Sequence, residues 1–179
     1  MITGGSGTIG FAIAEAFSKL GAQTVLVDKD ETTLKKAITK LGHGHGYFPI
    51  DVTEADAANQ AMLAAIQNFG GLDILVSNAG AAHAGPMLSI SNDELRSAFE
   101  LNFFSHYSFS TAAAKILKNQ NRGGQILFNI SKQAVNPGRN FGAYGLPKAT
   151  TFFLMRQLAL ELGSDGIRVN GVNADRIRS

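Results

Sequence analysis

The chain has 179 residues, enough for one domain of average size and with little room for two. A hydrophobic fraction of 45% supports a sizeable core and excludes an intrinsically disordered chain. The net charge is only +2, from 16 Lys and Arg against 14 Asp and Glu, which is too balanced to indicate a nucleic-acid-binding surface.

Helix-like and strand-like runs alternate from the start of the chain. After a glycine cluster, apolar residues at three- and four-residue steps over 9–20 predict a first helix that ends at Gly21. The short β-branched run 24–27 predicts a buried strand, which ends in the acid Asp28. A helix over about 30–41 and a strand near 47–50 follow.

The second half of the chain continues this alternation. Two capping boxes mark helix starts, Thr53 with Asp56 and, more strongly, Ser91 with Glu94. The predicted elements are helices over about 53–69, 91–118 and 144–162 and strands over 72–77, 125–130 and 167–172.

Strands joined by helices predict an α/β fold with a mainly parallel sheet, covered on both faces and connected by right-handed crossovers. We expect residues 1–179 to form a single domain. In such sheets ligands bind at the carboxyl ends of the strands. Four polar residues stand at those ends, namely Asp28, Asp51, Asn78 and Ser131.

Glycines at positions 4, 7 and 10 directly precede the first helix, where backbone amides can accept a phosphate and a side chain would block a pyrophosphate. Taken alone, this spacing also fits a plain strand-to-helix turn. Asp28 stands 18 residues after Gly10, and a carboxylate there can bind ribose hydroxyls and repel a 2′-phosphate. The pattern therefore favours NAD, while Lys29 leaves NADP open.

Tyr144 and Lys148 are four residues apart and share a helix face. Pro147 is tolerated only near a helix start, which puts Tyr144 in the first turn. The pKa of a phenol must fall by about two to three units before it acts as a base near neutrality. The Lys148 ammonium, a nicotinamide cation and the helix terminus could together lower it.

Other cofactors and compartments have little support. With no cysteine, disulfides, Cys-ligated zinc and thiol nucleophiles are excluded, and His43 and His45 lack carboxylate neighbours, so we expect no metal site. No signal peptide and no apolar run of about 18 residues is visible, so we expect a cytoplasmic protein without membrane contact.

Together these motifs resemble the short-chain dehydrogenase/reductase family, over essentially the whole chain. The resemblance implies a Rossmann-like doubly wound parallel sheet and NAD-dependent hydride transfer to or from a small alcohol or carbonyl substrate. It implies Tyr144 as general acid/base, Lys148 as the group that binds the nicotinamide ribose and lowers the Tyr144 pKa, Ser131 as a hydrogen-bond partner of the substrate, and Asn102 as the holder of a relay water. The cofactor-lining set implied is Gly4, Ser6, Thr8, Ile9, Asp28, Asp51, Val52, Asn78, Gly80, Tyr144 and Lys148.

Two departures keep alternatives open. Thr8 replaces the usual middle glycine, and the resulting spacing resembles the extended branch of the family, so an NAD-recycling epimerase or dehydratase stays open. The segments 131–138 and 173–175 resemble the dehydrogenase half of bifunctional rhamnulose-phosphate aldolase/dehydrogenase proteins. That likeness implies a small hydroxy or aldehyde substrate, rhamnose metabolism and an aldolase domain in a longer parent.

Family members begin with a full first strand and continue beyond this C-terminus, so we expect a domain truncated at both ends. A nucleotide-binding module that is inactive because it is truncated therefore remains an alternative. Eight of the 12 phenylalanines lie from Phe99 onward, many on the two long predicted helices. These helices pair across a dimer interface in the family, which implies a homodimer or homotetramer.

Overall fold

The computed structural model describes residues 1–175 of the chain. Its centre is a six-stranded sheet in the order β3-β2-β1-β4-β5-β6, in which all five strand pairs are parallel. The strands are β1 (Ile2–Thr3), β2 (Val25–Asp28), β3 (Gly46–Pro49), β4 (Ile74–Ser77), β5 (Gly124–Asn129) and β6 (Ile167–Val172). The strand order reverses between β1 and β4, as in a Rossmann-like doubly wound sheet, and the predicted fold class is confirmed.

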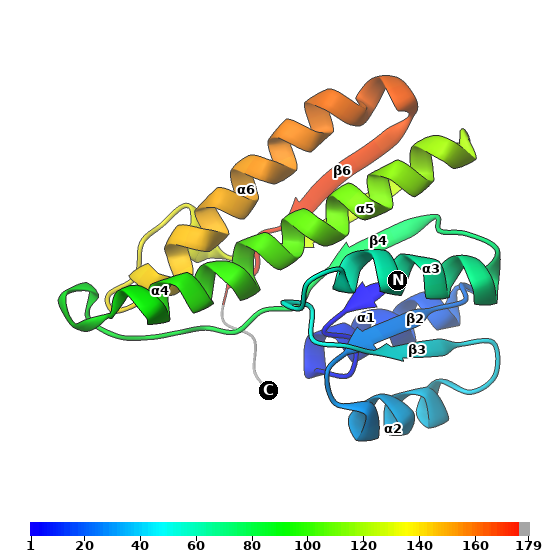
Figure 1. Ribbon diagram of the computed structural model, residues 1–179, viewed down its shortest axis with the longest axis horizontal. Helices are drawn as coiled ribbons and strands as arrows, with labels where there is room; N and C mark the ends of the chain where they lie inside the picture. The colour runs from blue at the N-terminus through cyan, green and yellow to red at the C-terminus, as the bar shows by residue number, and fades with distance from the viewer. Residues whose placement is uncertain (176–179) are drawn as a thin grey trace.

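Helices cover the two faces of the sheet (Figure 1). On one face α1 (Thr8–Lys19) and α2 (Glu31–Leu41) pack against the strands, and on the other lie α3 (Ala57–Phe69), α5 (Ser105–Gln120) and α6 (Gly142–Leu162). The alternation of side chains along β2 explains both contacts, since Val25 and Val27 join the core under α3 and α5 while Leu26 joins the core under α1 and α2.

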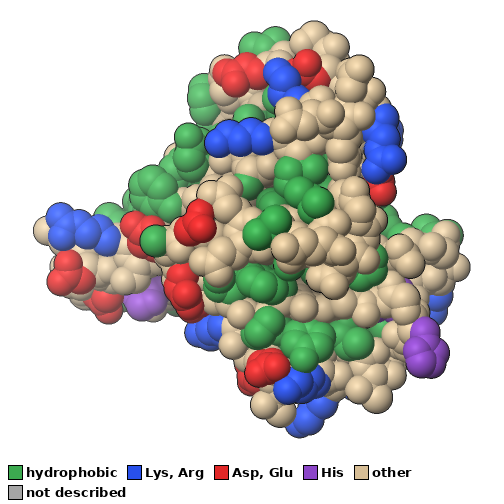
Figure 2. Space-filling view, turned by 45° about the vertical axis from the view of Figure 1, so that its right-hand side comes forward, with side chains coloured by type: hydrophobic (Ala, Val, Ile, Leu, Met, Phe, Trp, Pro, Cys, Tyr) green, Lys and Arg blue, Asp and Glu red, His purple; other side chains and the backbone are tan. Residues whose placement is uncertain are grey.

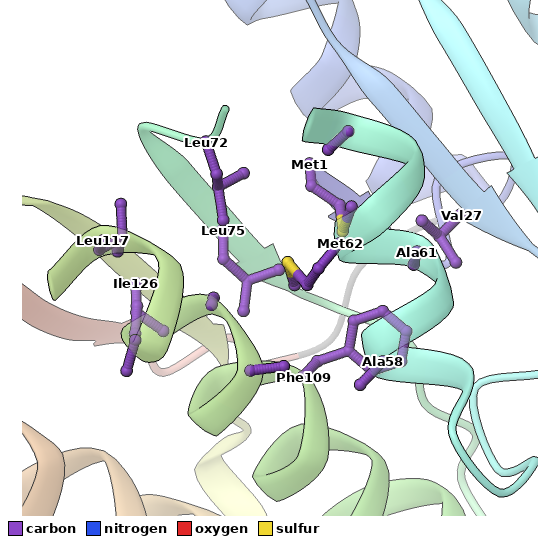
Figure 3. Packing of buried hydrophobic residues seen from close by; sticks show 14 of the residues in the cluster. Met1, Val27, Ala58, Ala61, Met62, Leu72, Leu75, Phe109, Leu117 and Ile126 are labelled. Atoms are coloured by element: carbon purple, nitrogen blue, oxygen red, sulfur yellow. The ribbon is translucent and has the colours of Figure 1, made fainter. Parts of the chain in front are cut away.

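The larger core lies between the sheet and α3, α5 and α6. Figure 3 shows part of it, where Leu75 of β4, Met62 of α3 and Phe109 of α5 converge. Leu75 is fully buried and Phe109 is 1% exposed. Small residues such as Ala58 and Ala61 on the inner face of α3 leave room for these larger side chains.

The two predicted capping boxes have different outcomes. The box at α4 (Asn92–Phe99) is confirmed, because Ser91 Oγ accepts from the Glu94 amide and Glu94 Oε2 accepts from the Ser91 amide. The box at Thr53 and Asp56 is wrong, and α3 begins only at Ala57. Thr53 Oγ1 donates to Asp51 Oδ1 at 2.7 Å, and Asp56 has the left-handed conformation with a φ of +66°, so no helix runs from Thr53 through it.

The long helix predicted over 91–118 is interrupted in the structure. Between α4 and α5 the chain forms a π-helical turn over Glu100–Phe104, which contains Asn102. Such turns occur often at functional sites, and this one changes the direction in which the residues after α4 face.

The surface carries charges of both signs. On the face drawn in Figure 2, acidic and basic side chains are interspersed, with hydrophobic side chains gathered between them. Within residues 1–175 no helix has the length and apolar character needed to span a bilayer.

Candidate active site

A cleft of about 520 Å³ opens at the carboxyl ends of the strands, beside the point where the strand order reverses. Most of the predicted site residues line it. They are Gly4, Thr8, Ile9, Asp28, Asp51, Val52, Asn78, Gly80, Tyr144 and Lys148. The cleft therefore gathers residues from 4 to 148, which is what the strand-end positions in the sequence predicted.

The predicted residues Ser6, Asn102 and Ser131 do not line the cleft but contact residues that do. Ser6 Oγ donates to Asp28 Oδ2 at 2.7 Å. Asn102 Oδ1 accepts from the Ala81 amide at 3.2 Å. Ser131 hydrogen-bonds to the Tyr144 hydroxyl.

The glycine turn between β1 and α1 brings backbone close to backbone. A Cβ on Gly10 would overlap the carbonyl oxygen of Gly4, and one on Gly4, whose φ is +62°, would lie 3.0 Å from Ala79 Cα. Gly7 caps α1 without a side-chain hydrogen bond, so the amides of its first turn are free of a capping side chain at the cleft. This cradle fits the pyrophosphate of a dinucleotide, since α1 supplies amide donors and no side chain fills the turn.

Asp28 is fixed at the end of β2 by three donors. Its Oδ2 accepts from the amide and hydroxyl of Ser6, and its Oδ1 accepts from the Lys29 amide at 2.9 Å. Thr33 Oγ1 donates in turn to Ser6 Oγ at 3.0 Å. The carboxylate is thus held on the edge of the glycine turn, where it can accept from ribose hydroxyls.

Asn78 joins β1 to β5 across the floor of the cleft. Its backbone amide donates to Thr3 Oγ1 and its Nδ2 donates to the Thr3 carbonyl, each at 2.9 Å. Its Oδ1 accepts from Asn129 Nδ2 at 2.9 Å. The Asn129 carbonyl accepts from Lys148 Nζ, so an unbroken chain of hydrogen bonds runs from the glycine turn to Lys148. Sequence reasoning did not assign Asn129 a role.

Lys148 is a buried cation beside Tyr144. The residue is only 2% exposed, and its Nζ lies 5.8 Å from the centre of the Tyr144 ring. Burial lowers the pKa of Lys148 to about 8. Tyr144 is the third residue of α6, so the prediction that it lies in the first turn is confirmed.

The pKa of Tyr144 moves in the direction opposite to the one that the resemblance implied. Burial raises the Tyr144 pKa, and the hydrogen bond with Ser131 offsets this only in part. The contacts within the chain therefore do not by themselves make Tyr144 a base, and a further positive charge is required for that.

Asn102 supports the turn that follows β4. Its Nδ2 donates to the carbonyls of Ala81 and Ala98, and its own carbonyl accepts from Thr151 Oγ1 at 2.7 Å. The residue is 1% exposed. A Cβ on Gly80 would lie 2.8 Å from Asn102 Oδ1, so glycine lets the turn approach this amide.

His106 was assigned no role from the sequence, yet it lies directly behind the cleft. It is fully buried, its Nδ1 lies 2.6 Å from Ser77 Oγ, and its Nε2 lies 3.3 Å from Lys148 Nζ. The available signal was its position four residues after Asn102, one turn further along the helix.

The family model for short chain dehydrogenases matches residues 1–179 of the sequence. The chain belongs to the short-chain dehydrogenase family. The resemblance drawn from the glycine turn, Asn78 to Gly80 and the pair Tyr144 and Lys148 is thereby confirmed at the level of the family.

Individual relatives of this short-chain dehydrogenase differ in length. The uncharacterized oxidoreductase YuxG of Bacillus subtilis is 33% identical over 182 residues, which cover 99% of this chain and 26% of YuxG. The 7alpha-hydroxysteroid dehydrogenase of Escherichia coli K12 is 34% identical over 96% of this chain and 68% of its own. The chain thus spans about a quarter of one relative and about two thirds of the other.

Solved structures share the fold. The 3-ketoacyl-(acyl-carrier-protein) reductase of Brucella melitensis, crystallised with NADH, superposes with a TM-score of 0.94 at 27% identity. The match covers 97% of this short-chain dehydrogenase and 74% of the reductase.

Proposed function

We propose that this chain is an NAD-dependent oxidoreductase that acts on a small alcohol or carbonyl substrate with the catalytic residues Asn102, Ser131, Tyr144 and Lys148. The observation that carries the proposal is the buried Lys148 ammonium, which lies beside Tyr144 in the same cleft as the glycine turn. Burying a cation costs free energy, and perturbed titratable groups in a cleft are typical of active sites.

A bound nicotinamide cofactor supplies hydride transfer to or from the reacting carbon. Tyr144 would exchange a proton with the substrate oxygen, and Ser131, its hydrogen-bond partner, would hold that oxygen beside it. Lys148 would bind the nicotinamide ribose, and its charge together with that of an oxidised nicotinamide would favour the phenolate form of Tyr144. Asn102 would hold a water that connects Lys148 to solvent.

Cofactor preference rests on Asp28. The carboxylate lies on the cleft wall and is held there by Ser6, so it would accept from the ribose hydroxyls of NAD and repel the 2′-phosphate of NADP. Lys29 also lines the cleft and is the residue that could offset this repulsion.

A thermal melt of the chain with NAD and with NADP tests the cofactor assignment. At 100 times its dissociation constant, NAD should add about 2.7 kcal/mol to the free energy of unfolding and raise Tm. NADP at the same concentration should raise Tm less than NAD does. Asp28→Asn should reduce this difference between the two Tm increases, because it removes the negative charge that repels the 2′-phosphate. A melt unmoved by either nucleotide would contradict cofactor binding by this chain.

We further propose a small hydroxy or aldehyde compound as substrate, in a dehydrogenase linked to rhamnose metabolism and fused to an aldolase in a longer protein. The support is the likeness of segments 131–138 and 173–175 to such proteins, together with the small share of YuxG that the chain spans. The assay follows NADH absorbance with L-lactaldehyde, and with a 7α-hydroxysteroid because one relative bears that name. Activity on the steroid alone would contradict the proposal.

We also propose that the protein forms a homodimer or homotetramer through α5 and α6. Phe153 and Leu160 on α6 are 65% and 80% exposed, and Tyr107 on α5 is 48% exposed. Large exposed apolar side chains on long helices are typical of oligomer interfaces. Phe153→Lys should shift the mass measured by light scattering towards the monomer. The control Leu88→Lys, at a fully exposed position outside α5 and α6, should leave the mass unchanged.

A further inference from the structure

A buried line of three side chains crosses from β4 through α5 to α6. Ser77 Oγ lies 2.6 Å from His106 Nδ1, and His106 Nε2 lies 3.3 Å from Lys148 Nζ. The three residues are 1%, 0% and 2% exposed. The ring of Phe128 packs against the imidazole, with 6.0 Å between the ring centres. Apolar side chains of similar size would pack in this core at a lower cost in free energy. The buried line of polar groups therefore indicates a functional role.

The neighbours of His106 determine which of its nitrogens carries the proton. Burial and, second, the charge of Lys148 hold the pKa of His106 well below its usual range, and a backbone hydrogen bond with Ala79 acts weakly the other way. The ring is therefore neutral, with one donor and one acceptor. An ammonium group can only donate, so Nε2 accepts from Lys148 and Nδ1 donates to Ser77 Oγ.

In this arrangement, Lys148 donates two of its three ammonium hydrogens to acceptors within the chain. One is donated to the Asn129 carbonyl at 2.9 Å and one to His106 Nε2. The tetrahedral geometry of the group then fixes the direction of the third hydrogen. Lys148 lines the cleft, so this is the hydrogen left for a ligand.

We propose that His106 is a positioning residue, which fixes the Lys148 ammonium toward the nicotinamide end of the cofactor while Ser77 fixes the imidazole ring. This inference rests on the proposed function, in which Lys148 binds the nicotinamide ribose. A lysine side chain has four rotatable torsions, and two fixed acceptors remove most of that freedom before the cofactor arrives. The groups that face this pair are Tyr144 from α6 and the uncharged Ser77 and Asn129 from the sheet.

The test compares His106→Leu with His106→Gln in the full chain, by titration of NADH and of AMP. NADH reaches Lys148, whereas AMP corresponds only to the adenosine half near Asp28. His106→Leu should raise the NADH dissociation constant about tenfold, since a hydrogen bond to a charged group is lost, and leave that of AMP unchanged. His106→Gln should stay within about threefold of the wild type, because its amide oxygen can replace Nε2 as acceptor. His83→Leu, at a half-buried position that does not line the cleft, is the control and should change neither constant.

The pH dependence of NADH binding separates positioning from a merely structural role. NADH affinity should fall as pH rises through about 8, where Lys148 loses its proton. In His106→Leu the midpoint of that fall should move to lower pH by about one unit, because the ammonium form has lost an acceptor. A packing defect alone would weaken binding at every pH without moving the midpoint.

Lys148→Met separates failure of this inference from failure of the proposed function. If Lys148→Met binds NADH as the wild type does, the proposed function fails. If Lys148→Met weakens NADH binding while His106→Leu leaves both the dissociation constant and the midpoint unchanged, the positioning role of His106 is overturned. If His106→Leu does not fold, the Ser77→Ala variant tests the positioning role of His106 instead. It should raise the NADH constant about threefold with AMP unchanged, since the ring loses its anchor, and no change would overturn the inference.

Discussion

Tyr144→Phe should lower kcat by about three orders of magnitude while leaving the NADH dissociation constant nearly unchanged. Phenylalanine keeps the ring that lies 5.8 Å from Lys148 Nζ and removes only the hydroxyl that would transfer the proton. The measurement is steady-state NADH absorbance with whichever of the two assayed substrates the wild type turns over, alongside a separate titration of NADH.

Tyr107→Phe is the matched control, because it removes the same hydroxyl from a half-exposed residue on α5 outside the cleft. It should retain the wild-type kcat. Full turnover by Tyr144→Phe would remove Tyr144 from the mechanism, whatever the cofactor.

Gly10→Ala should lower the free energy of unfolding by about 3 kcal/mol and abolish the increase in that free energy caused by NAD. The added Cβ would overlap the Gly4 carbonyl oxygen and crowd Gly5 Cα, and both are backbone atoms that cannot rotate away. The turn would have to open, which moves the first amides of α1 out of the cradle. Urea unfolding with and without NAD measures both effects.

Gly163→Ala tests whether any added methyl group has this effect. Gly163 has a φ of −59°, and nothing lies within 4 Å of the position that a Cβ would take there, so alanine should change stability by less than about 0.5 kcal/mol. If Gly10→Ala and Gly163→Ala unfold at the same urea concentration, the close packing of the glycine turn is not a determinant of stability.

Much of the fold could be predicted because its signals are local. The strand predicted over 167–172 is found at those residues, and the Ser91 capping box places the start of α4 correctly. The box at Thr53 was predicted wrongly because the left-handed backbone of Asp56, which stops a helix from running through it, depends on how the loop before α3 turns. The π-helical turn at Asn102 also has no periodic signal, since five residues are too few to shift the apolar pattern.

The candidate site also has a part that could be predicted from local sequence signals and a part that could not. Strand ends could be located by sequence pattern, so the residues that line the cleft were predicted largely as a group. Contacts between distant elements could not be located in this way. The hydrogen bonds of Asn129 and His106 with Lys148 form only when β5, α5 and α6 pack together. The direction of the Tyr144 pKa was missed for this reason, since it depends on burial. Preference for NAD, the catalytic roles and truncation at both ends stay predictions.

The central position of β1 has a consequence for how the protein folds. Ile2 pairs with Leu26 on one side and with Val76 on the other, and every strand pair within residues 1–175 is parallel, so no hairpin of that part of the chain can start the sheet. Each pairing must wait for an intervening helix, and contacts of such long sequence separation slow folding relative to a helical bundle of equal size. The bonds between Thr3 and Asn78 join residues 75 positions apart. The cleft is therefore completed late, and during refolding NAD binding should return together with the finished sheet rather than before it.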